Sequence, residues 1–434
     1  MMMRAVCVVI GLIWAVPALG FEVRELTTPS GIEVWFVEDH TIPIVSAEIA
    51  FRGGAADDPA GKAGLSKFAM SLLDEGAGPM EATAFQAALE ERGIRLGFDA
   101  GRDSLSGDLT TLSIHADRGF ELLGLALSQP RFDDTAVEKI RAQLLGLIAR
   151  GLESPDTQAA HALFAMLFPQ DGYGRPTDGT LETVKAVSKA DLQAFAQTRL
   201  VRSRLIVSVV GAIDEDRLVA LIDKSFAGLP EGTPWTAPPL GFEAKPAFKM
   251  IRKPMPQSVV YFALPGLTRD DPDYIAAFVM NHILGGGVFT SRLGLEVREK
   301  RGLAYGISTS FNPYQRAGLL IGRVGTRNDA VAETLTIVRD ELRKMAAGGV
   351  TAEELEAAKT YLTGAYPLRF DTQARIAGQL MGLQLYGIDP GYFERRNALI
   401  EAVTLADVNR LAAELLDTTK LSIALVGDPE PTPQ

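Results

Sequence analysis

Two segments of this chain, 187–211 and 403–427, are copies of one another. The first reads VSKADLQAFAQTRLVRSRLIVSVVG and the second VTLADVNRLAAELLDTTKLSIALVG. They align without a gap at an offset of 216 residues, with about eight identical positions. Each copy is typical of a capped amphipathic helix, a polar turn and an apolar strand that ends at glycine. Solenoid units are only roughly 20–50 residues long, so a repeat of about half the chain length predicts two similar domains.

Composition narrows the classes of protein to which the 434 residues can belong. A hydrophobic fraction of 47% and a charged fraction of 22% are typical of a folded globular protein. The net charge is −11, and there is no cluster of lysines and arginines. We therefore expect no binding to nucleic acid, because neutralisation of phosphates supplies most of that affinity.

The first 20 residues have the pattern of a secretory signal peptide. Arg4 precedes the apolar run AVCVVIGLIWAVPALG, in which Ala18 and Gly20 are small residues at positions −3 and −1 before Phe21. The run is shorter than the ~20 apolar residues of a membrane span, so we expect cleavage before Phe21 and no span afterwards. Cys7 is the single cysteine, so the mature chain would contain no disulfide. These features predict a periplasmic protein.

Hydrophobic periodicity predicts the same order of elements in two halves, 21–229 and 249–434, with a linker rich in proline and glycine at 230–248. Strands are expected at 32–38, 44–52, 94–116 (a pair), 257–264, 303–325 (a pair) and 420–426. Helices are expected at about 62–75, 136–152, 156–168, 272–284, 291–301, 329–347, 352–366, 371–386 and 404–416, and one more begins at Thr83. We predict an α+β fold of two homologous domains, each a mostly antiparallel sheet with helices packed on one face.

Two further stretches are distinctive, YGRPTDGTLETV at 173–184 and FTSRLGLEVREKRGLAYGIS at 289–308. Together with the duplicated plan, they resemble the M16 (pitrilysin- or insulinase-like) family of zinc peptidases. The likeness extends over essentially the whole chain after residue 20, and it is greatest to the short bacterial forms related to mitochondrial processing peptidase. This resemblance implies the LuxS-metallohydrolase-like fold and a connection with peptide hydrolysis.

Active members of that family carry H-x-x-E-H on the helix after the second strand, where two histidines bind zinc and the glutamate is the general base. The matching helix here reads GLSKFAMSLLDEG, with Lys67 and Ser71 at the histidine positions and Met70 at the glutamate position. The family's third ligand is a glutamate on the following long helix, and the matching segment 141–152 has no acid. The resemblance implies no zinc and no general base in this chain, and zinc in a partner subunit.

Other residues give weaker indications of catalysis. The four histidines are His40, His115, His161 and His282. No two of them have the spacing of one helical turn, so a metal site built from them has no signal in the sequence. Lys67 is expected to extend along the edge of its helix, and Asp74 and Glu75 are too near the end of that helix to form a catalytic pair.

The second half keeps two residues that suit substrate contact. Arg298 and Tyr305 flank a turn at Gly302, and an arginine fork with a tyrosine hydroxyl suits a carboxylate or a peptide carbonyl. In the family this R-x6-Y pair lies opposite the zinc and contacts substrate, and the resemblance implies the same role here. The residue types alone leave open an ion pair of Arg298 with Glu296 or Glu299, and a packed Tyr305.

Three neighbouring features are open alternatives. Arg292 and Arg301 are other candidates for the arginine, although Arg301 is expected to be a charge at a helix C-terminus. The glycines at 285–287 predict a flexible connection and not a phosphate-binding loop. Residues 94–108 match the family's substrate-pairing edge strand, in an irregular form.

These features predict a non-catalytic, substrate-binding subunit of a periplasmic heteromeric M16-type zinc peptidase that acts on peptides. A partner subunit would carry H-x-x-E-H. The alternatives are a peptide-binding or structural protein of the same fold with no role in proteolysis, and an independent hydrolase that uses other residues.

Overall fold

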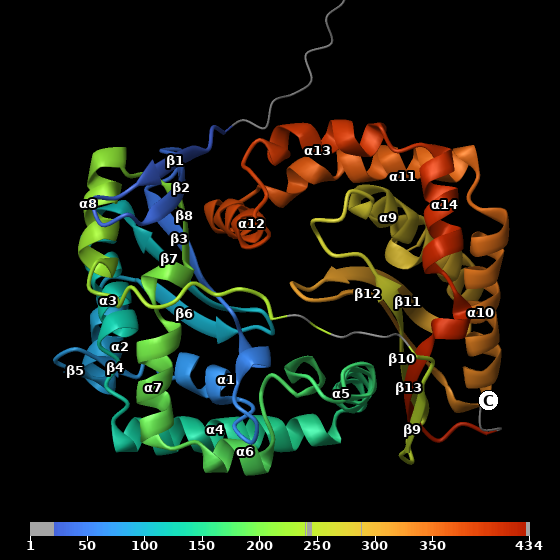
Figure 1. Ribbon diagram of the computed structural model, residues 1–434, viewed down its shortest axis with the longest axis horizontal. Coiled ribbons are helices and arrows are strands. Elements are labelled where there is room, and N and C mark those ends of the chain that lie inside the picture. The colour runs from blue at the N-terminus through green and yellow to red at the C-terminus, as the bar shows by residue number, and fades with distance from the viewer. Residues whose placement is uncertain (1–20, 239, 241–244, 288, 431–434) are drawn as a thin grey trace, which may run out of the picture.

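The computed structural model describes residues 21–238, 240, 245–287 and 289–430. The predicted signal peptide at 1–20 lies outside the described residues. Two sheets face each other across the molecule, and most helices lie on their outer sides (Figure 1). Within the described ranges, no helix has the length and apolar character needed to cross a membrane.

The first half builds a six-stranded sheet in the order β1–β2–β8–β3–β7–β6. Its strands are β1 (Arg24–Thr27), β2 (Glu33–Glu38), β3 (Ile44–Arg52), β6 (Arg95–Ala100), β7 (Ser104–Leu112) and β8 (Leu205–Gly211). Strands β2 and β8 are parallel, and all the other neighbours are antiparallel. A small hairpin joins β4 (Gly76–Ala77) to β5 (Met80–Glu81).

The second half builds a five-stranded sheet in the order β11–β12–β10–β13–β9. Its strands are β9 (Phe248–Arg252), β10 (Gln257–Gly266), β11 (Ala304–Pro313), β12 (Gly318–Arg327) and β13 (Ser422–Gly427). Here β13 and β9 are the parallel pair. The order repeats that of the first sheet without β1, so β6 and β11 are equivalent edge strands.

Fourteen α-helices are found in the described part of the chain. Those of the first half are α1 (Leu65–Met70), α2 (Ala82–Glu90), α3 (Ala116–Ser128), α4 (Asp134–Glu153), α5 (Pro155–Leu167), α6 (Leu181–Ala186), α7 (Lys189–Arg199) and α8 (Glu215–Phe226). Those of the second half are α9 (Tyr274–Asn281), α10 (Val331–Gly348), α11 (Ala352–Gly364), α12 (Gln373–Leu385), α13 (Tyr392–Glu401) and α14 (Leu405–Leu415). Two π-helical segments, His282–Gly286 and Gly294–Glu299, follow α9. The predicted α+β fold is confirmed.

The repeated segments take the same local structure. The first forms α7 and β8, and the second forms α14 and β13. Each helix begins with a capping box, in which Ser188 bonds with Asp191 and Thr404 bonds with Asp407. Each strand ends at a glycine for which a Cβ has no room; at Gly211, for example, it would lie 2.4 Å from a backbone oxygen. The repeat therefore preserves the caps and the close backbone approaches.

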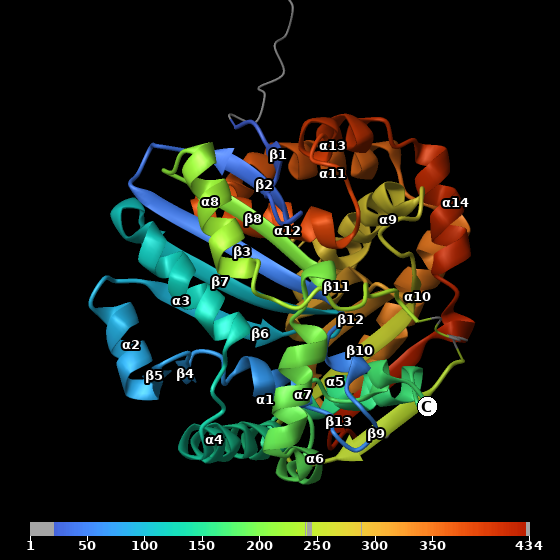
Figure 2. The same ribbon diagram turned by 60° about the vertical axis from the view of Figure 1, so that its left-hand side comes forward.

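The two halves exchange one helix each. Helix α5 belongs to the first half but packs on β10 and β13, where Leu163 contacts a cluster with Ala424. Helix α12 belongs to the second half but packs on β3 and β8, where Leu380 joins a cluster with Trp35 and Val210. Both helices lie between the sheets in Figure 1, and Figure 2 shows α12 behind the first sheet. The sequence did not predict this exchange, which covers the inner face of each sheet with the other half's helix.

The YGRP motif lies at the joint between the halves. The Tyr173 side chain is fully buried; its hydroxyl donates to Asp103 and accepts from the backbone N–H of Arg316 at 3.1 Å. A Cβ at Gly172 would lie 1.8 Å from the carbonyl oxygen of Ala56, so this position requires glycine. The motif therefore joins the first half to the β11–β12 hairpin.

The described residues of the linker are fixed by hydrogen bonds to both halves. The indole nitrogen of Trp235 donates to Asp57 at 2.8 Å, and Arg204 donates to the Thr233 carbonyl at 3.1 Å. From the second half, Arg316 donates to the carbonyl of Pro238 at 2.8 Å. The described part of the linker between Thr233 and Pro238 is thus bonded to both halves.

Candidate functional site

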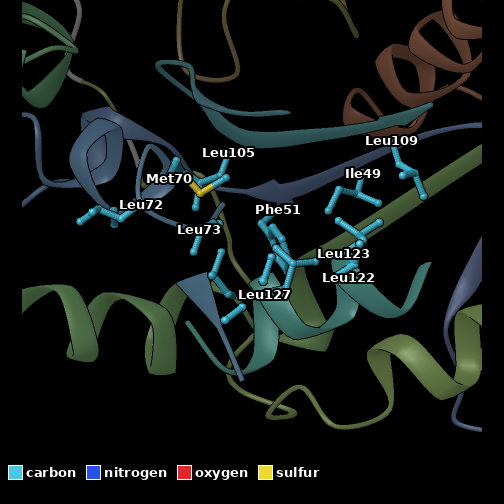
Figure 3. Packing of buried hydrophobic residues seen from close by; sticks show 14 of the residues in the cluster. Ile49, Phe51, Met70, Leu72, Leu73, Leu105, Leu109, Leu122, Leu123 and Leu127 are labelled. Atoms are coloured by element: carbon cyan, nitrogen blue, oxygen red, sulfur yellow. The ribbon is translucent and has the colours of Figure 1, made fainter. Parts of the chain in front are cut away.

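Helix α1 is where the family's zinc ligands would lie, and its packing shows what replaced them. Met70 is fully buried in the first-half core with Leu72 and Leu73 (Figure 3). The helix ends at Met70 and not near residue 75, so the predicted length was wrong. Apolar residues at nearly every position from 68 to 73 are buried, and one face of an α-helix cannot hold them all. The chain tightens instead, with bonds such as Leu73 N–H to the Met70 carbonyl.

The positions that would hold zinc offer no ligand for it. Lys67 forms a short ion pair with Asp99 on the edge strand β6. An ammonium group repels a cation, a core thioether at Met70 is out of reach, and the hydroxyl of Ser71 is a poor zinc ligand. Zinc does not fit this set of residues.

The acids near the end of α1 are engaged elsewhere. Glu75 is buried, and both of its oxygens accept from Lys139 on α4, at 2.7 and 2.8 Å. Asp74 accepts from Gln86, and burial raises its pKa. Both acids are thus engaged in contacts within the first half.

Helix α4, which would supply the third ligand, presents leucines instead. Leu147 and Leu152 are 41% and 51% exposed, and they line a cavity of about 570 Å³ with His161 and Asp178. Burial lowers the pKa of His161, which favours the neutral imidazole. The wall of the cavity formed by α4 is thus mostly apolar.

One histidine does lie near two acids. The ligand atoms of Glu38, His40 and Asp214 lie within 4.8 Å of one another at the surface. Glu38 already accepts from His40 and from Arg24, both at 2.9 Å. A guanidinium group at this place opposes a metal cation, so the cluster is a surface ion-pair network.

The structure brings Arg298 and Tyr305 into one pocket, of about 380 Å³. Strand β11 has a bulge here, because Ala304 pairs with Thr326 but Ile307 pairs with Val324. The extra residue leaves Tyr305 unpaired and turns it outward, so that it is 91% exposed. The alternative of a packed Tyr305 is therefore wrong, whereas the role in substrate contact stays a prediction.

Of the three candidate arginines, two are held by strong ion pairs with other residues, which leaves Arg298 to contact a ligand. Arg292 is bound to Glu354 through two bonds of 2.7 Å. Arg301 and Lys300 both bind Glu296 and hold its pKa at about 2. Of the two ion pairs considered from the sequence, Arg298–Glu296 does not form, whereas Arg298–Glu299 forms at 3.6 Å.

Two weaker contacts hold Arg298 at the edge of the pocket. Its Nε lies 3.6 Å from Glu299, and its guanidinium carbon lies 4.4 Å from the centre of the Phe289 ring. Stacking on an exposed aromatic ring orients the fork without using its hydrogen-bond donors.

The glycines at 285–287 are more ordered than expected. Gly285 is buried in a π-helical turn, where a Cβ would lie 2.4 Å from Thr309 Oγ1 on β11. Close packing on β11 thus explains Gly285.

Sequence reasoning missed a second polar pocket, between α9, α12 and α13. Its three arginines, Arg269, Arg369 and Arg396, are spread over more than a hundred residues and form no motif. The only local signal is a pair of glycines one turn apart, Gly378 and Gly382, inside a predicted helix.

The sequence and the fold of this chain are similar to those of known proteins. Residues 186–362 match a family model described as Peptidase M16 inactive domain. The chain is 26% identical over 416 residues to a Helicobacter pylori protein named non-peptidase homolog YmxG, covering 94% of this chain and 96% of that one. It is 27% identical to an uncharacterised zinc protease of Mycobacterium bovis, with 95% and 94% covered. A crystal structure titled peptidase M16 inactive domain, from Pseudomonas fluorescens, superimposes with a TM-score of 0.88 at 27% identity, covering 95% of this chain and 99% of that chain.

Proposed function

This chain belongs to the M16 peptidase family, and we propose that it is the non-catalytic, substrate-binding subunit of a heteromeric M16 zinc peptidase acting on peptides in the periplasm. One observation carries the proposal: Lys67, Met70 and Ser71 replace the zinc site, while the pocket of Arg298 and Tyr305 stays open. The name of the Helicobacter relative, a non-peptidase homologue, agrees with the lack of catalysis.

The open pocket can bind the polar groups of a peptide. The exposed Tyr305 hydroxyl donates a hydrogen bond to a carbonyl oxygen, and the Arg298 fork takes a carbonyl or carboxylate through two parallel donors. Strand β11 lies at the edge of its sheet, so an extended peptide could pair with its free backbone groups. These groups bind and orient a peptide, and neither is placed to activate water.

Hydrolysis would require a partner subunit. That subunit would carry H-x-x-E-H, with zinc to polarise the scissile carbonyl and glutamate as the base. Holding the peptide from the opposite side restricts its motion and raises the rate at a metal that this chain does not contain.

The test is reconstitution with an H-x-x-E-H subunit from the same organism. We expect no peptide cleavage by the chain alone, and chelator-sensitive cleavage by the mixture. Arg298→Ala should lower kcat/KM of the mixture by about tenfold or more, the loss expected for a charge-assisted hydrogen bond of roughly 1.5–3 kcal/mol. Tyr305→Phe should lower it by about two- to tenfold, the loss expected for a neutral hydrogen bond of roughly 0.5–1.5 kcal/mol.

Matched controls are available on the same half. Arg343 and Tyr361 are an exposed arginine and tyrosine of α10 and α11, so Arg343→Ala and Tyr361→Phe should leave the rate unchanged. Chelator-insensitive cleavage by the chain alone would refute the proposal. A mixture that never associates, while the chain still binds peptide, would support the peptide-binding or structural alternative.

A further inference from the structure

A second pocket, of about 230 Å³, lies between α9, α12 and α13 in the second half. In Figure 1, α9 lies on the side of α12 that is turned away from the first sheet, and α13 lies above them. None of its lining residues belongs to the pocket of Arg298 and Tyr305. It therefore requires an explanation of its own.

Three arginines line this pocket, and no aspartate or glutamate does. Arg396 is buried at 6% exposure, Arg269 is half-buried and Arg369 is exposed at the rim. In the part of the chain that the structure describes, none of the three forms an ion pair. Elsewhere on these helices the arginines are paired, as Arg395 is with Asp389 at 2.7 Å. Three uncompensated cations in one small cavity are unusual in a chain of net charge −11.

Aromatic rings hold the guanidinium groups in place without neutralising them. Arg269 lies 4.3 Å from the ring centre of Tyr274 and 4.9 Å from that of Tyr392. Arg396 lies 3.9 Å from the ring centre of Tyr366. Such stacking fixes the plane of a guanidinium and leaves its N–H donors free.

The buried arginine has unused hydrogen-bonding capacity. Nη1 of Arg396 donates to the Leu362 carbonyl at 3.2 Å and to Asn397 at 3.1 Å. Among the described residues, its other two nitrogens have no hydrogen-bond partner. Burial lowers the pKa of Arg396, and the charges of Arg369 and Arg269 lower it further. A bound anion would relieve both penalties.

The phenols of the pocket supply neutral donors beside these charges. Burial raises the pKa of Tyr366 and of Tyr386 to about 12, so both hydroxyls are protonated at neutral pH. A protonated phenol donates to an oxyanion as readily as to water.

The floor of the pocket is open because α12 has glycines there. Gly378 and Gly382 lie one turn apart, and a Cβ on either would meet nothing within 4 Å. Glycine inside a helix costs roughly 0.5–1 kcal/mol relative to alanine, and here no packing partner requires it. The two glycines instead keep the space above α12 free.

We propose that this pocket binds a small organic oxyanion, a carboxylate or phosphate carried on a short apolar or aromatic group. Arg269, Arg369 and Arg396 bind the oxygens, and the tyrosine rings and the bare surface of α12 accommodate the attached group. The volume equals that of about eight water molecules at roughly 30 Å³ each, which limits the ligand to a single small moiety. A peptide's terminal carboxylate and a phosphate ester share this chemistry.

Calorimetric titration of the mature full-length chain at low ionic strength tests the proposal. The probes are inorganic phosphate, phenyl phosphate, N-acetylphenylalanine and the amide of N-acetylphenylalanine. We expect 1:1 binding of at least one organic oxyanion at millimolar concentration or below, and none of the neutral amide. Binding of phenyl phosphate alone identifies the phosphate class, binding of N-acetylphenylalanine alone identifies the carboxylate class, and binding of both supports the shared chemistry.

Variants then locate the site. The double variant Arg269→Gln plus Arg369→Gln should raise Kd by at least about tenfold, since charge-assisted bonds are lost. Gly382→Leu should abolish binding by filling the pocket, since a Cβ at this position meets nothing within 4 Å and the side chain extends into the open space. Arg395→Gln removes a neighbouring arginine that does not line the pocket, and it should leave Kd unchanged.

Folding of each variant is checked by its thermal melting temperature. If Gly382→Leu does not fold, Gly382→Ala serves instead, because alanine favours the helix and still narrows the pocket. Binding of no probe overturns the proposal. So does binding that survives both the double arginine variant and the glycine variant.

Discussion

The edge strands β6 and β11 occupy equivalent places in the two sheets, yet their surroundings differ. Beside β6, the side chains at the catalytic positions are used for stability: Lys67 binds Asp99, and Met70 is in the core. Beside β11, a bulge turns Tyr305 into solvent, where it contributes little to the fold. Duplication thus kept the scaffold in both halves, whereas of these two edge strands it is β11 that presents an exposed tyrosine.

The largest difference between the two regions is expected when an acidic residue is placed at position 70. Met70→Glu places a carboxyl in a closed apolar core, so we expect a loss of about 4 kcal/mol in the free energy of unfolding. Ser71→Glu, at the next and half-buried position, should cost much less. Urea denaturation measures both. Equal effects would mean that position 70 is not committed to the core.

Substitutions in the exchanged helices test whether the two halves unfold independently. Leu380→Ala on α12 removes a fully buried side chain, at a cost of about 3 kcal/mol. Leu380 packs on the first sheet. If the two halves unfold together, Leu380→Ala should accelerate amide hydrogen exchange in β13 of the second sheet as well as in β8 of the first. Leu368→Ala, at a position 73% exposed, is the control and should have no effect. A response confined to β8 would show that the halves unfold independently.

Two tyrosine hydroxyls give a smaller contrast. Tyr173→Phe removes the donor to the half-buried Asp103 and the acceptor of the Arg316 N–H, so we expect a loss of about 2 kcal/mol. Tyr305→Phe should stay within about 0.5 kcal/mol, since its hydroxyl is exposed. Thermal unfolding distinguishes them. A destabilised Tyr305→Phe would contradict the view that this hydroxyl is free for a ligand.

The weakest effect concerns pH. Burial, with Asp108 nearby, raises the pKa of Glu48 from 4.5 to about 7 in the folded chain. The folded state therefore holds the proton more tightly, and this stabilisation is lost as pH rises from about 5 through 7. We expect a decrease of about 1 kcal/mol from this group, because solvent still reaches the carboxyl.

Glu48→Gln should make unfolding less pH-dependent over that range. Glu296→Gln is the opposite case, because its pKa of about 2 means that the wild-type carboxylate stabilises above pH 4.5 and loses that effect as pH falls. Melting temperatures at pH 5 and pH 8 measure the effect of Glu48→Gln, and those at about pH 2 and pH 5 measure the effect of Glu296→Gln. An unchanged profile for Glu48→Gln would show that Glu48 titrates normally.

Periodicity and caps predicted the elements that depend on local sequence. The strand at 44–52 was predicted with the bounds that β3 has, and the helix predicted at 371–386 is α12. Helix α3 was not predicted; Gly119 and Gly124 weaken its local signal, and Gly124 is there for close packing on Ser225. Strand β9 was not predicted, and its first residue, Phe248, was placed in the linker, because the strand pairs only with β13, far along the chain.

The candidate site also has features that local sequence predicts and features that depend on contacts distant in sequence. The motif and its spacing identified Arg298 and Tyr305. The bulge that exposes Tyr305 depends on the register of β11 with β12, so the residues around Tyr305 do not predict it. The three arginines of the second pocket meet only through the packing of α9 and α13 against α12, so no window of sequence contains them.

The exchange of α5 and α12 has a consequence for how the chain can be made. Helix α5 leaves the ribosome long before β13, the last strand of the sheet that it covers. The first sheet likewise has a bare inner face until α12 is complete. Contacts this distant in sequence form late and slowly, and they leave apolar surface exposed in the meantime. A chain truncated before Gln373 would therefore lack both α12 and β13. It would expose the inner face of the first sheet and the side of α5 that packs on β13, and would be an aggregation-prone intermediate rather than a smaller working domain.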